Sequence, residues 1–205
     1  MSSIRIVIFA KAPLAGLAKT RLIPALGEQG SARLAQRMLR HTVAEALAAD
    51  VGEIELCVTP EPGAQQWRPF RDPEWPVAWQ AQGDGDLGER LARATRRGVL
   101  DGRAVLLIGT DCPFLAAERL REAATQLVSK DAVIIPSADG GYVLLGLKTF
   151  NPSVFRGIAW STDSVAFDTL CRIGVLQWSV AQLPMLCDID EPADLAALPQ
   201  DWCVR

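Results

Sequence analysis

The chain has 205 residues, of which 49% are apolar, and a formal net charge of −3. This length and apolar content predict a single domain over residues 1–205 with a sizeable core. No apolar run approaches the ~20 residues that span a bilayer, so we expect no membrane partner.

The five cysteines are scattered and include no C-x-x-C pair, which argues against a zinc site or a disulfide framework. We also expect no signal peptide, because the apolar run at the start has no basic leader and no A-x-A exit. A reduced, cytoplasmic location fits both observations.

Charge is distributed unevenly along the chain. Residues 1–50 carry a net charge of +4, with seven basic residues against three acidic ones, and the remainder is acidic. A basic first quarter predicts a small anionic ligand, whereas nucleic acid usually requires a wide basic face. The single histidine, His41, lies in a helical pattern, and this argues against Ser-His-Asp and Cys-His catalysis.

Strand and helix patterns alternate along the whole chain. Apolar or β-branched runs predict strands, and residues at helical spacing with capping residues or glycine at their ends predict helices. Strands are expected at 4–9, 53–59, 75–82, 104–111, 131–138, 142–147 and 175–183, and helices at 28–49, 87–100, 115–129, 161–174 and 190–198. This alternation predicts an α/β fold with a mostly parallel sheet.

The loop after the first strand, residues 10–24, contains three cations and no acid. Ligands of such sheets bind beyond the carboxyl ends of the strands. Gly16 permits a tight turn, and Lys11, Lys19 and Arg21 can converge on a phosphate. Pro13 and Ala18 stand where a P-loop requires glycine, so this is not a P-loop. The alternative is solvated surface charge.

The second candidate loop is GDGDLG, residues 83–88. It fits the dinucleotide fingerprint G-x-G-x-x-G, which would predict a nicotinamide-dependent oxidoreductase. However, Asp84 and Asp86 would repel a pyrophosphate, and the fingerprint belongs after the first strand. A loop that lines a base or ribose is the preferred interpretation, with Gly88 allowing a close backbone approach.

Three acidic motifs follow later strands. Asp111 in GTDCP (109–113) is placed to hold Mg²⁺ or Mn²⁺, or to cap the next helix. Asp188 and Asp190 in CDIDEPADL (187–195) point the same way; we assign Asp190 to a helix N-cap and Asp188 to a metal shared with Asp111. Asp139 in ADGGYVLLGL (138–147) stands beside a glycine pair, in a motif that also fits an ordinary turn.

Together these motifs resemble a known family. F-A-K-A-P-x-x-G-x-x-K-T-R-L, D-L-G-E-R, G-T-D-C-P, D-G-G-Y-V-L-L-G-L and D-I-D-E-P-A-D-L occur in this order. The set is similar to bacterial nucleotide-diphospho-sugar transferase-like proteins, including arsenosugar-biosynthesis glycosyltransferases, which are related to the nucleotidyltransferases of cofactor assembly. The resemblance spans nearly the whole chain and implies a GT-A fold, a three-layer α/β/α sandwich around a mixed sheet.

The resemblance also implies roles for individual residues. Phosphates would be held by Lys11, Gly16, Lys19 and Arg21. The nucleoside would lie near Asp86, Leu87 and Gly88. The acceptor would face Asp139, Gly140, Gly141, Trp160, Ser161 and Thr162. Asp111 would stand at the metal position, although T-D-C has one acid where other members of the fold have two.

These observations lead to a metal-assisted transferase with a nucleotide-activated donor, a small-molecule acceptor and Lys19, Asp111 and Asp139 as catalytic residues. Glycosyl transfer from a nucleotide-diphospho-sugar is favoured by the resemblance alone, and nucleotidyl transfer to a phosphorylated small molecule is the alternative. A non-catalytic nucleotide-binding protein of the same fold is a further alternative, motivated by the single acid in GTDCP.

Overall fold

Within residues 4–199 and 202, which the computed structural model describes, seven strands form one sheet in the order β3-β2-β1-β4-β6-β5-β7. All neighbouring strands are parallel except at β6, which runs antiparallel to both β4 and β5. The strands are β1 (Ile4–Lys11), β2 (Gly52–Thr59), β3 (Ala78–Ala81), β4 (Ala104–Ile108), β5 (Ala132–Pro136), β6 (Tyr142–Leu147) and β7 (Val180–Gln182).

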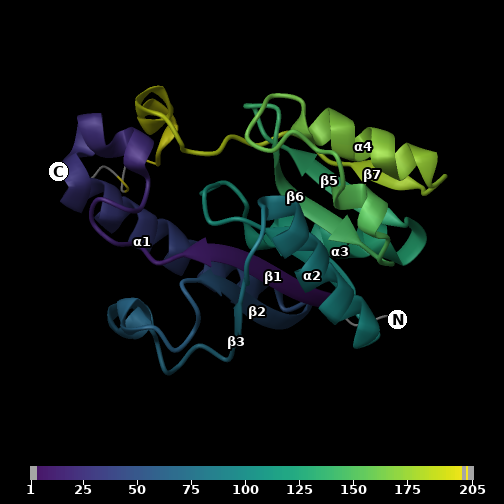
Figure 1. Cartoon of the computed structure of the whole chain (residues 1–205), viewed down its shortest axis with the longest axis horizontal. Coiled ribbons are helices and arrows are strands. Elements are labelled where there is room, and N and C mark those ends of the chain that lie inside the picture. The colour runs from purple at the N-terminus through teal and green to yellow at the C-terminus, as the bar shows by residue number, and fades with distance from the viewer. Residues whose placement is uncertain (1–3, 200–201, 203–205) are drawn as a thin grey trace.

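Helices cover both faces of this sheet (Figure 1). Apolar side chains of α1 (Ile23–Ala49) and α3 (Ala117–Ser129) form one core cluster with one face of β1, and those of α2 (Leu87–Leu100) and α4 (Val165–Val175) form another with the opposite face. The strands alternate accordingly, with Ile6 and Ile8 in the first cluster and Val7 in the second. The predicted three-layer α/β/α architecture with a mostly parallel mixed sheet is confirmed.

The described structure differs from the predicted elements mainly near the C-terminus. The predicted helix at 161–174 begins only at Val165, because Ser161 has φ +66°, which an α-helix does not accommodate. That helix continues to Val175, so the predicted strand at 175–183 is reduced to the three residues of β7. The expected helix at 190–198 is the 3-10 helix η4 (Pro192–Ala197), whose N-cap is Glu191. The assignment of Asp190 as N-cap was therefore wrong.

The C-terminal segment crosses the carboxyl ends of the strands and reaches the start of α1 (Figure 1). There Ile189 and Trp202 join Leu22, Leu34 and Met38 in a third, smaller core cluster. The backbone N–H of Ile189 also donates to the carbonyl of Asp111 at 2.9 Å. These contacts hold residues 187–190 beside the loop that follows β4.

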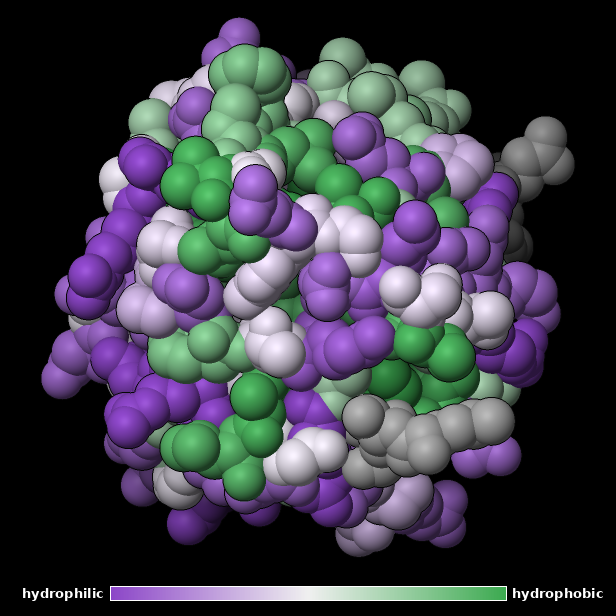
Figure 2. All heavy atoms as spheres, turned by 90° about the vertical axis from the view of Figure 1, so that its right-hand side faces the viewer, coloured by the Kyte–Doolittle hydropathy of each residue, from purple (hydrophilic) through white to green (hydrophobic). Residues whose placement is uncertain are grey.

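At the opposite end of the sheet, where β1 begins, the surface of the molecule is not one continuous hydrophobic area (Figure 2). Hydrophobic residues there form separate patches between hydrophilic ones. Among the described residues, no helix combines the length and the hydrophobicity needed to cross a bilayer.

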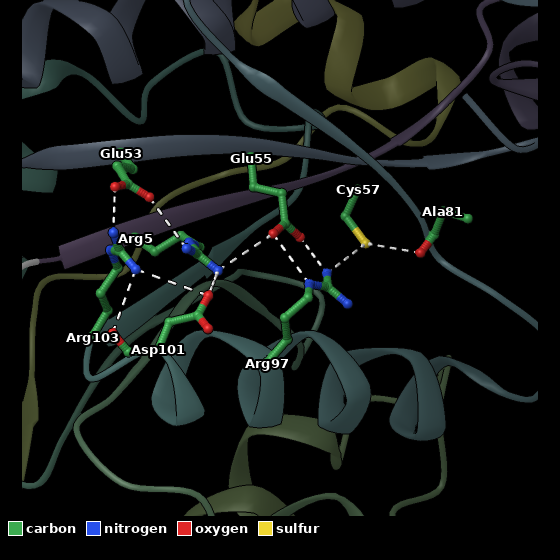
Figure 3. A network of polar contacts seen from close by, with 8 residues as sticks. All are labelled: Arg5, Glu53, Glu55, Cys57, Ala81, Arg97, Asp101 and Arg103. Carbon is green, nitrogen blue, oxygen red and sulfur yellow. Dashed lines mark hydrogen bonds and ion pairs between the residues drawn. The ribbon is translucent and has the colours of Figure 1, made fainter. Parts of the chain in front are cut away.

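An ion-pair network joins β1, β2 and α2 (Figure 3). Glu55 has a side chain only 4% exposed and accepts bonds from the Arg97 guanidinium, including one of 3.2 Å from Nε. Arg5 lies 3.8 Å from the same carboxylate and 2.7 Å from Asp101. The neighbouring thiol of Cys57 is not activated, because burial and the charge of Glu55 raise its pKa to about 11. The network ties α2 to β1 and β2.

Replacing Glu55 with alanine is expected to lower the free energy of unfolding by about 3 kcal/mol, because Arg97 and Arg5 lose their buried partner. Urea unfolding followed by circular dichroism measures this change. Glu53→Ala is the matched control, since Glu53 is 57% exposed although it also binds Arg5 and Arg103. We expect that control to change stability much less than Glu55→Ala, because exposed ion pairs contribute little. Equal effects of both substitutions would contradict the structural role assigned to Glu55.

Candidate functional site

A cleft of about 780 Å³ opens at the carboxyl ends of β1 and β4. This is the position at which α/β sheets bind their ligands. Its lining combines residues from widely separated parts of the sequence, contributed by the loops after β1, β4, β5 and β6 and by the C-terminal segment. The predicted site residues among them are Lys11, Lys19, Arg21, Leu87, Asp111, Asp139, Gly141, Trp160, Ser161, Thr162 and Asp188.

Lys19 is the most tightly held cation of the cleft. Its ammonium donates to Asp190 Oδ1 and to the carbonyl of Ile189, both at 2.7 Å, and lies 2.5 Å from Asp111 Oδ1. Its side chain is only 8% exposed. Burial alone would lower the pKa of Lys19, but the two carboxylates outweigh it and raise that pKa above its ordinary value. Lys19 is therefore charged and bound to carboxylates, and the structure brings together Lys19 and Asp111, two of the predicted catalytic residues.

The other two cations of this loop are more accessible. Lys11 is exposed at the end of β1, and the Arg21 side chain is 66% exposed, with Nη1 3.8 Å from Glu191 Oε1. Both line the same cleft as Lys19. The loop therefore presents two cations to an incoming anion and keeps the third against carboxylates.

Three carboxylates, one of which also binds Lys19, converge in the same cleft. One oxygen each from Asp139, Asp188 and Asp190 lie within 4.8 Å of one another. Burial and the neighbouring charge of Asp139 raise the pKa of Asp188 to about 6, with Asp190 and Asp111 adding to the effect. Carboxylate oxygens so close together repel unless a cation lies between them, and this donor set is the one that Mg²⁺ and Mn²⁺ prefer. The residues therefore fit a divalent cation.

This acidic triad differs from the predicted metal ligands, which were Asp111 and Asp188. Asp190 takes part, and Asp111 instead pairs with Lys19. The signal for Asp190 was present in the sequence, since two aspartates spaced by two on an extended segment point the same way. Asp190 was instead assigned to a helix cap, and the predicted metal pair Asp111 and Asp188 stays a prediction.

The turn after β5 positions Asp139. The Oδ1 of Asp139 accepts a hydrogen bond from the backbone N–H of Gly141 at 2.9 Å and another from the hydroxyl of Ser137. Gly140, which follows Asp139 in the chain, has φ +89°, and a Cβ there would lie 2.0 Å from the carbonyl oxygen of Asp163. Gly140 does not line the cleft; it lets the segment containing Trp160, Ser161 and Thr162 pack against the turn.

Gly140→Ala is expected to lower the free energy of unfolding by about 3 kcal/mol, because the new methyl group clashes with backbone and φ is left-handed. Gly174→Ala is the matched control, since nothing lies within 4 Å of its Cβ position in α4. Alanine favours a helix over glycine by about 0.5–1 kcal/mol, so the control should be neutral or stabilising. Urea unfolding of both variants provides the measurement; a neutral Gly140→Ala would contradict this packing.

Three other predicted residues also lie outside the cleft lining. Gly16 has φ +74° and turns the loop beside the carboxylate of Glu28. Asp86 caps α2 in a reciprocal pair with Glu89. A Cβ on Gly88 would meet the indole nitrogen of Trp160 and the carbonyl of Phe155, each at 2.7 Å. Their predicted contacts with phosphate or nucleoside stay predictions, and Gly88 sets the position of Trp160.

The cleft is also lined by Gln82, Ser137 and Tyr142, which no sequence motif indicated. Gln82 donates from its side chain to the carbonyls of Ala10 and Cys57, at 3.2 and 3.0 Å, and so ties together the carboxyl ends of β1 and β2. No periodic pattern marks such a residue, because its role depends on the pairing of distant strands.

Comparisons with known proteins agree with this architecture. Residues 42–162 match the family described as "Uncharacterized protein conserved in bacteria (DUF2064)". A 2-phospho-L-lactate guanylyltransferase from Methanopyrus kandleri (strain AV19) is 30% identical over 187 residues, covering 86% of this chain and 82% of that protein.

Solved structures of other proteins also share this architecture. A Desulfovibrio desulfuricans G20 protein with the provisional name nucleotide-diphospho-sugar transferase superposes with a TM-score of 0.85 and 32% identity, over 93% of this chain and 84% of its own. Rv0371c of Mycobacterium tuberculosis H37Rv, solved in complex with manganese, has a TM-score of 0.55 and 19% identity, over 92% of each chain, and shows the fold alone. The chain belongs to the DUF2064 family and is a transferase similar to nucleotidyltransferases and nucleotide-sugar transferases.

Proposed function

We propose that this protein is a metal-dependent nucleotidyltransferase that moves a nucleoside monophosphate from a nucleoside triphosphate to a phosphorylated small molecule. The observation that carries the proposal is one cleft that contains both the acidic triad and the accessible cations Lys11 and Arg21. The 30% identical guanylyltransferase favours nucleotidyl over glycosyl transfer. It also makes GTP the first donor to test and a phosphorylated 2-hydroxy acid the first acceptor.

In this reaction an oxygen of the acceptor's phosphate attacks the α-phosphorus of the donor. The bond between that phosphorus and the oxygen bridging to the β-phosphate breaks, and pyrophosphate leaves. A phosphate dianion has no proton to lose, so the reaction requires no general base. Asp139, one of the predicted catalytic residues, is then assigned to the acidic triad instead of proton transfer.

The remaining residues are assigned by their place in the cleft. A divalent cation held by Asp139, Asp188 and Asp190 would neutralise negative charge on the donor phosphates. Lys11 and Arg21, which line the same cleft, add donors for the phosphates, and Arg21 can form two parallel bonds to one phosphate. Leu87 offers an apolar contact to the nucleoside. The segment with Trp160, Ser161 and Thr162 faces the acceptor.

Glycosyl transfer from a nucleotide-diphospho-sugar is the second candidate. The Desulfovibrio structure with its TM-score of 0.85 favours it through that protein's provisional name. The same cleft would serve, but the acceptor would attack a sugar carbon and a nucleoside diphosphate would leave.

The leaving group separates these two reactions. We expect purified protein with Mn²⁺, GTP and phosphorylated 2-hydroxy acids to release pyrophosphate, detected by a coupled phosphate assay, and to form a nucleoside diphosphate conjugate, detected by mass spectrometry. The same protein with UDP-, GDP- or dTDP-sugars should release no nucleoside diphosphate. Asp190→Ala should remove the activity, while Asp84→Asn, an exposed acid outside the cleft lining, should keep it. Acceptor-dependent release of nucleoside diphosphate would instead establish glycosyl transfer.

A further inference from the structure

We propose that Lys19 is an internal counter-ion that a divalent cation displaces, and that the displaced ammonium then binds the donor's phosphates. Cation binding thereby prepares the cleft for the nucleotide. This inference rests on the cation site of the proposed function, and it assigns to Lys19 a role that neither a static salt bridge nor a permanently phosphate-facing lysine would have.

The contacts of Lys19 already resemble those of a bound cation. Three oxygens, from Asp111, Asp190 and the carbonyl of Ile189, lie between 2.5 and 2.7 Å from the ammonium nitrogen. With its side chain 8% exposed, Lys19 has little room to contact a phosphate in this arrangement. A phosphate-binding role therefore requires the side chain to leave these oxygens.

Asp190 belongs both to the set of oxygens around Lys19 and to the acidic triad. It accepts from Lys19 at 2.7 Å and also contributes to the acidic triad with Asp139 and Asp188. A divalent cation on the triad would bring a second positive charge to the same carboxylate, and two such charges repel strongly in a partly buried site. The ammonium competes less strongly for Asp190 than a divalent cation does, because it carries one charge instead of two. When a nucleotide enters, the displaced ammonium also gains a new anionic partner.

Lys19 is well placed to move between the two partners. Its side chain is an unbranched four-carbon stem, and the residues that follow it, Thr20 and Arg21, line the same cleft. Its backbone is left-handed, with φ 48° and ψ 47°. This conformation is unfavourable in a residue with a side chain, and the contacts with the carboxylates help to maintain it.

Acetylation kinetics followed by mass spectrometry test the movement in the wild-type protein. Without metal, Lys19 should react at least about tenfold more slowly than exposed Lys11, because its ammonium is buried against three oxygen atoms. Adding Mn²⁺ alone should accelerate labelling of Lys19 several-fold and leave Lys11 unchanged. Adding GTP to the Mn²⁺-bound protein should protect Lys19 again.

Calorimetry with Mn²⁺ tests the competition directly. Lys19→Met should tighten Mn²⁺ binding by about tenfold, because the competing charge is removed from Asp190. Arg21→Met is the matched control: it removes the same charge from the same cleft, but among the described residues the ion-pair partner of Arg21 is Glu191, at 3.8 Å, and not a member of the acidic triad. That control should change Mn²⁺ affinity by less than about threefold, because an exposed charge is screened.

The outcomes separate this inference from the proposed function. If Mn²⁺ binds the wild-type protein while Lys19 stays protected and Lys19→Met binds no tighter than Arg21→Met, only the counter-ion inference is overturned. If neither the wild type nor Lys19→Met binds Mn²⁺, both the inference and the metal-dependent function fail. The labelling experiment uses no variant, so it decides the question even if Lys19→Met does not fold.

Discussion

Asp188→Asn is expected to raise the melting temperature of the metal-free protein at pH 7.5 while lowering nucleotidyl transfer at least about 100-fold. Both changes follow from the same arrangement of charges. In the absence of a cation, burial raises the pKa of the Asp188 carboxyl, and repulsion by the charges of Asp139, Asp190 and Asp111 raises it further. An asparagine removes this repulsion, and it also removes a ligand of the proposed cation.

The sign and size of the stability change follow from the pKa. The folded-state pKa of Asp188 is about 6, against an ordinary value of 3.8. Between pH 3.8 and about pH 6, the folded protein binds more protons at Asp188 than the unfolded chain does. The free energy of unfolding therefore falls as the pH rises through this range. The full shift would correspond to about 3 kcal/mol, which solvent screening of this half-buried group reduces to about 1 kcal/mol. For a chain of this size, that is a rise of roughly 2–4 °C.

Differential scanning fluorimetry at pH 3.5 and 7.5, with and without Mn²⁺, measures these effects. The stabilisation by Asp188→Asn should be present at pH 7.5 and absent at pH 3.5, where the wild-type carboxyl is already protonated. Mn²⁺ should stabilise the wild type and leave the variant unchanged. Asp84→Asn, an exposed acid outside the cleft lining, should behave like the wild type throughout. A variant that is less stable at pH 7.5 would show that Asp188 is not repelled by its neighbours.

Lys19→Met is expected to lower nucleotidyl transfer by about 100- to 1000-fold, the range found when one charged donor to a reacting group is removed. Lys19 is the cation closest to the acidic triad, and under the counter-ion inference it moves onto the donor phosphates. The loss should fall mainly on turnover, measured as pyrophosphate release at saturating GTP and Mn²⁺.

The stability of Lys19→Met separates a catalytic effect from misfolding. Asp111 and Asp190 have side chains 49% and 39% exposed, so water can solvate them once the ammonium is gone. We expect a loss of only about 1 kcal/mol in the free energy of unfolding, measured by urea unfolding. Lys11→Met is the control for charge, because Lys11 lines the same cleft but is exposed; it should lower turnover less than Lys19→Met. An equal loss in both variants would contradict a special role for Lys19.

The layers of the fold and the location of the site could be predicted because both depend on local signals. Buried runs such as residues 4–9 and 104–111 indicate parallel strands flanked by helices, and ligands bind where such strands end. This rule alone brought Lys19, Asp111, Asp139 and Asp188 into one cleft. The element boundaries near residues 161–183 were predicted less well, because Ser161 adopts a left-handed φ that its residue type does not indicate.

The sequence by itself determined the chemistry of this cleft: cations after the first strand and carboxylates after later ones, which is a set of groups for a phosphate and a divalent cation. Only the tertiary structure decided how these groups pair. Lys19 and Asp190 are separated by 171 positions along the chain, yet the C-terminal segment brings them to 2.7 Å. Such a pairing depends on core contacts, those of Ile189 and Trp202 with α1, and no local propensity or spacing encodes a contact between segments that meet only when the core is formed.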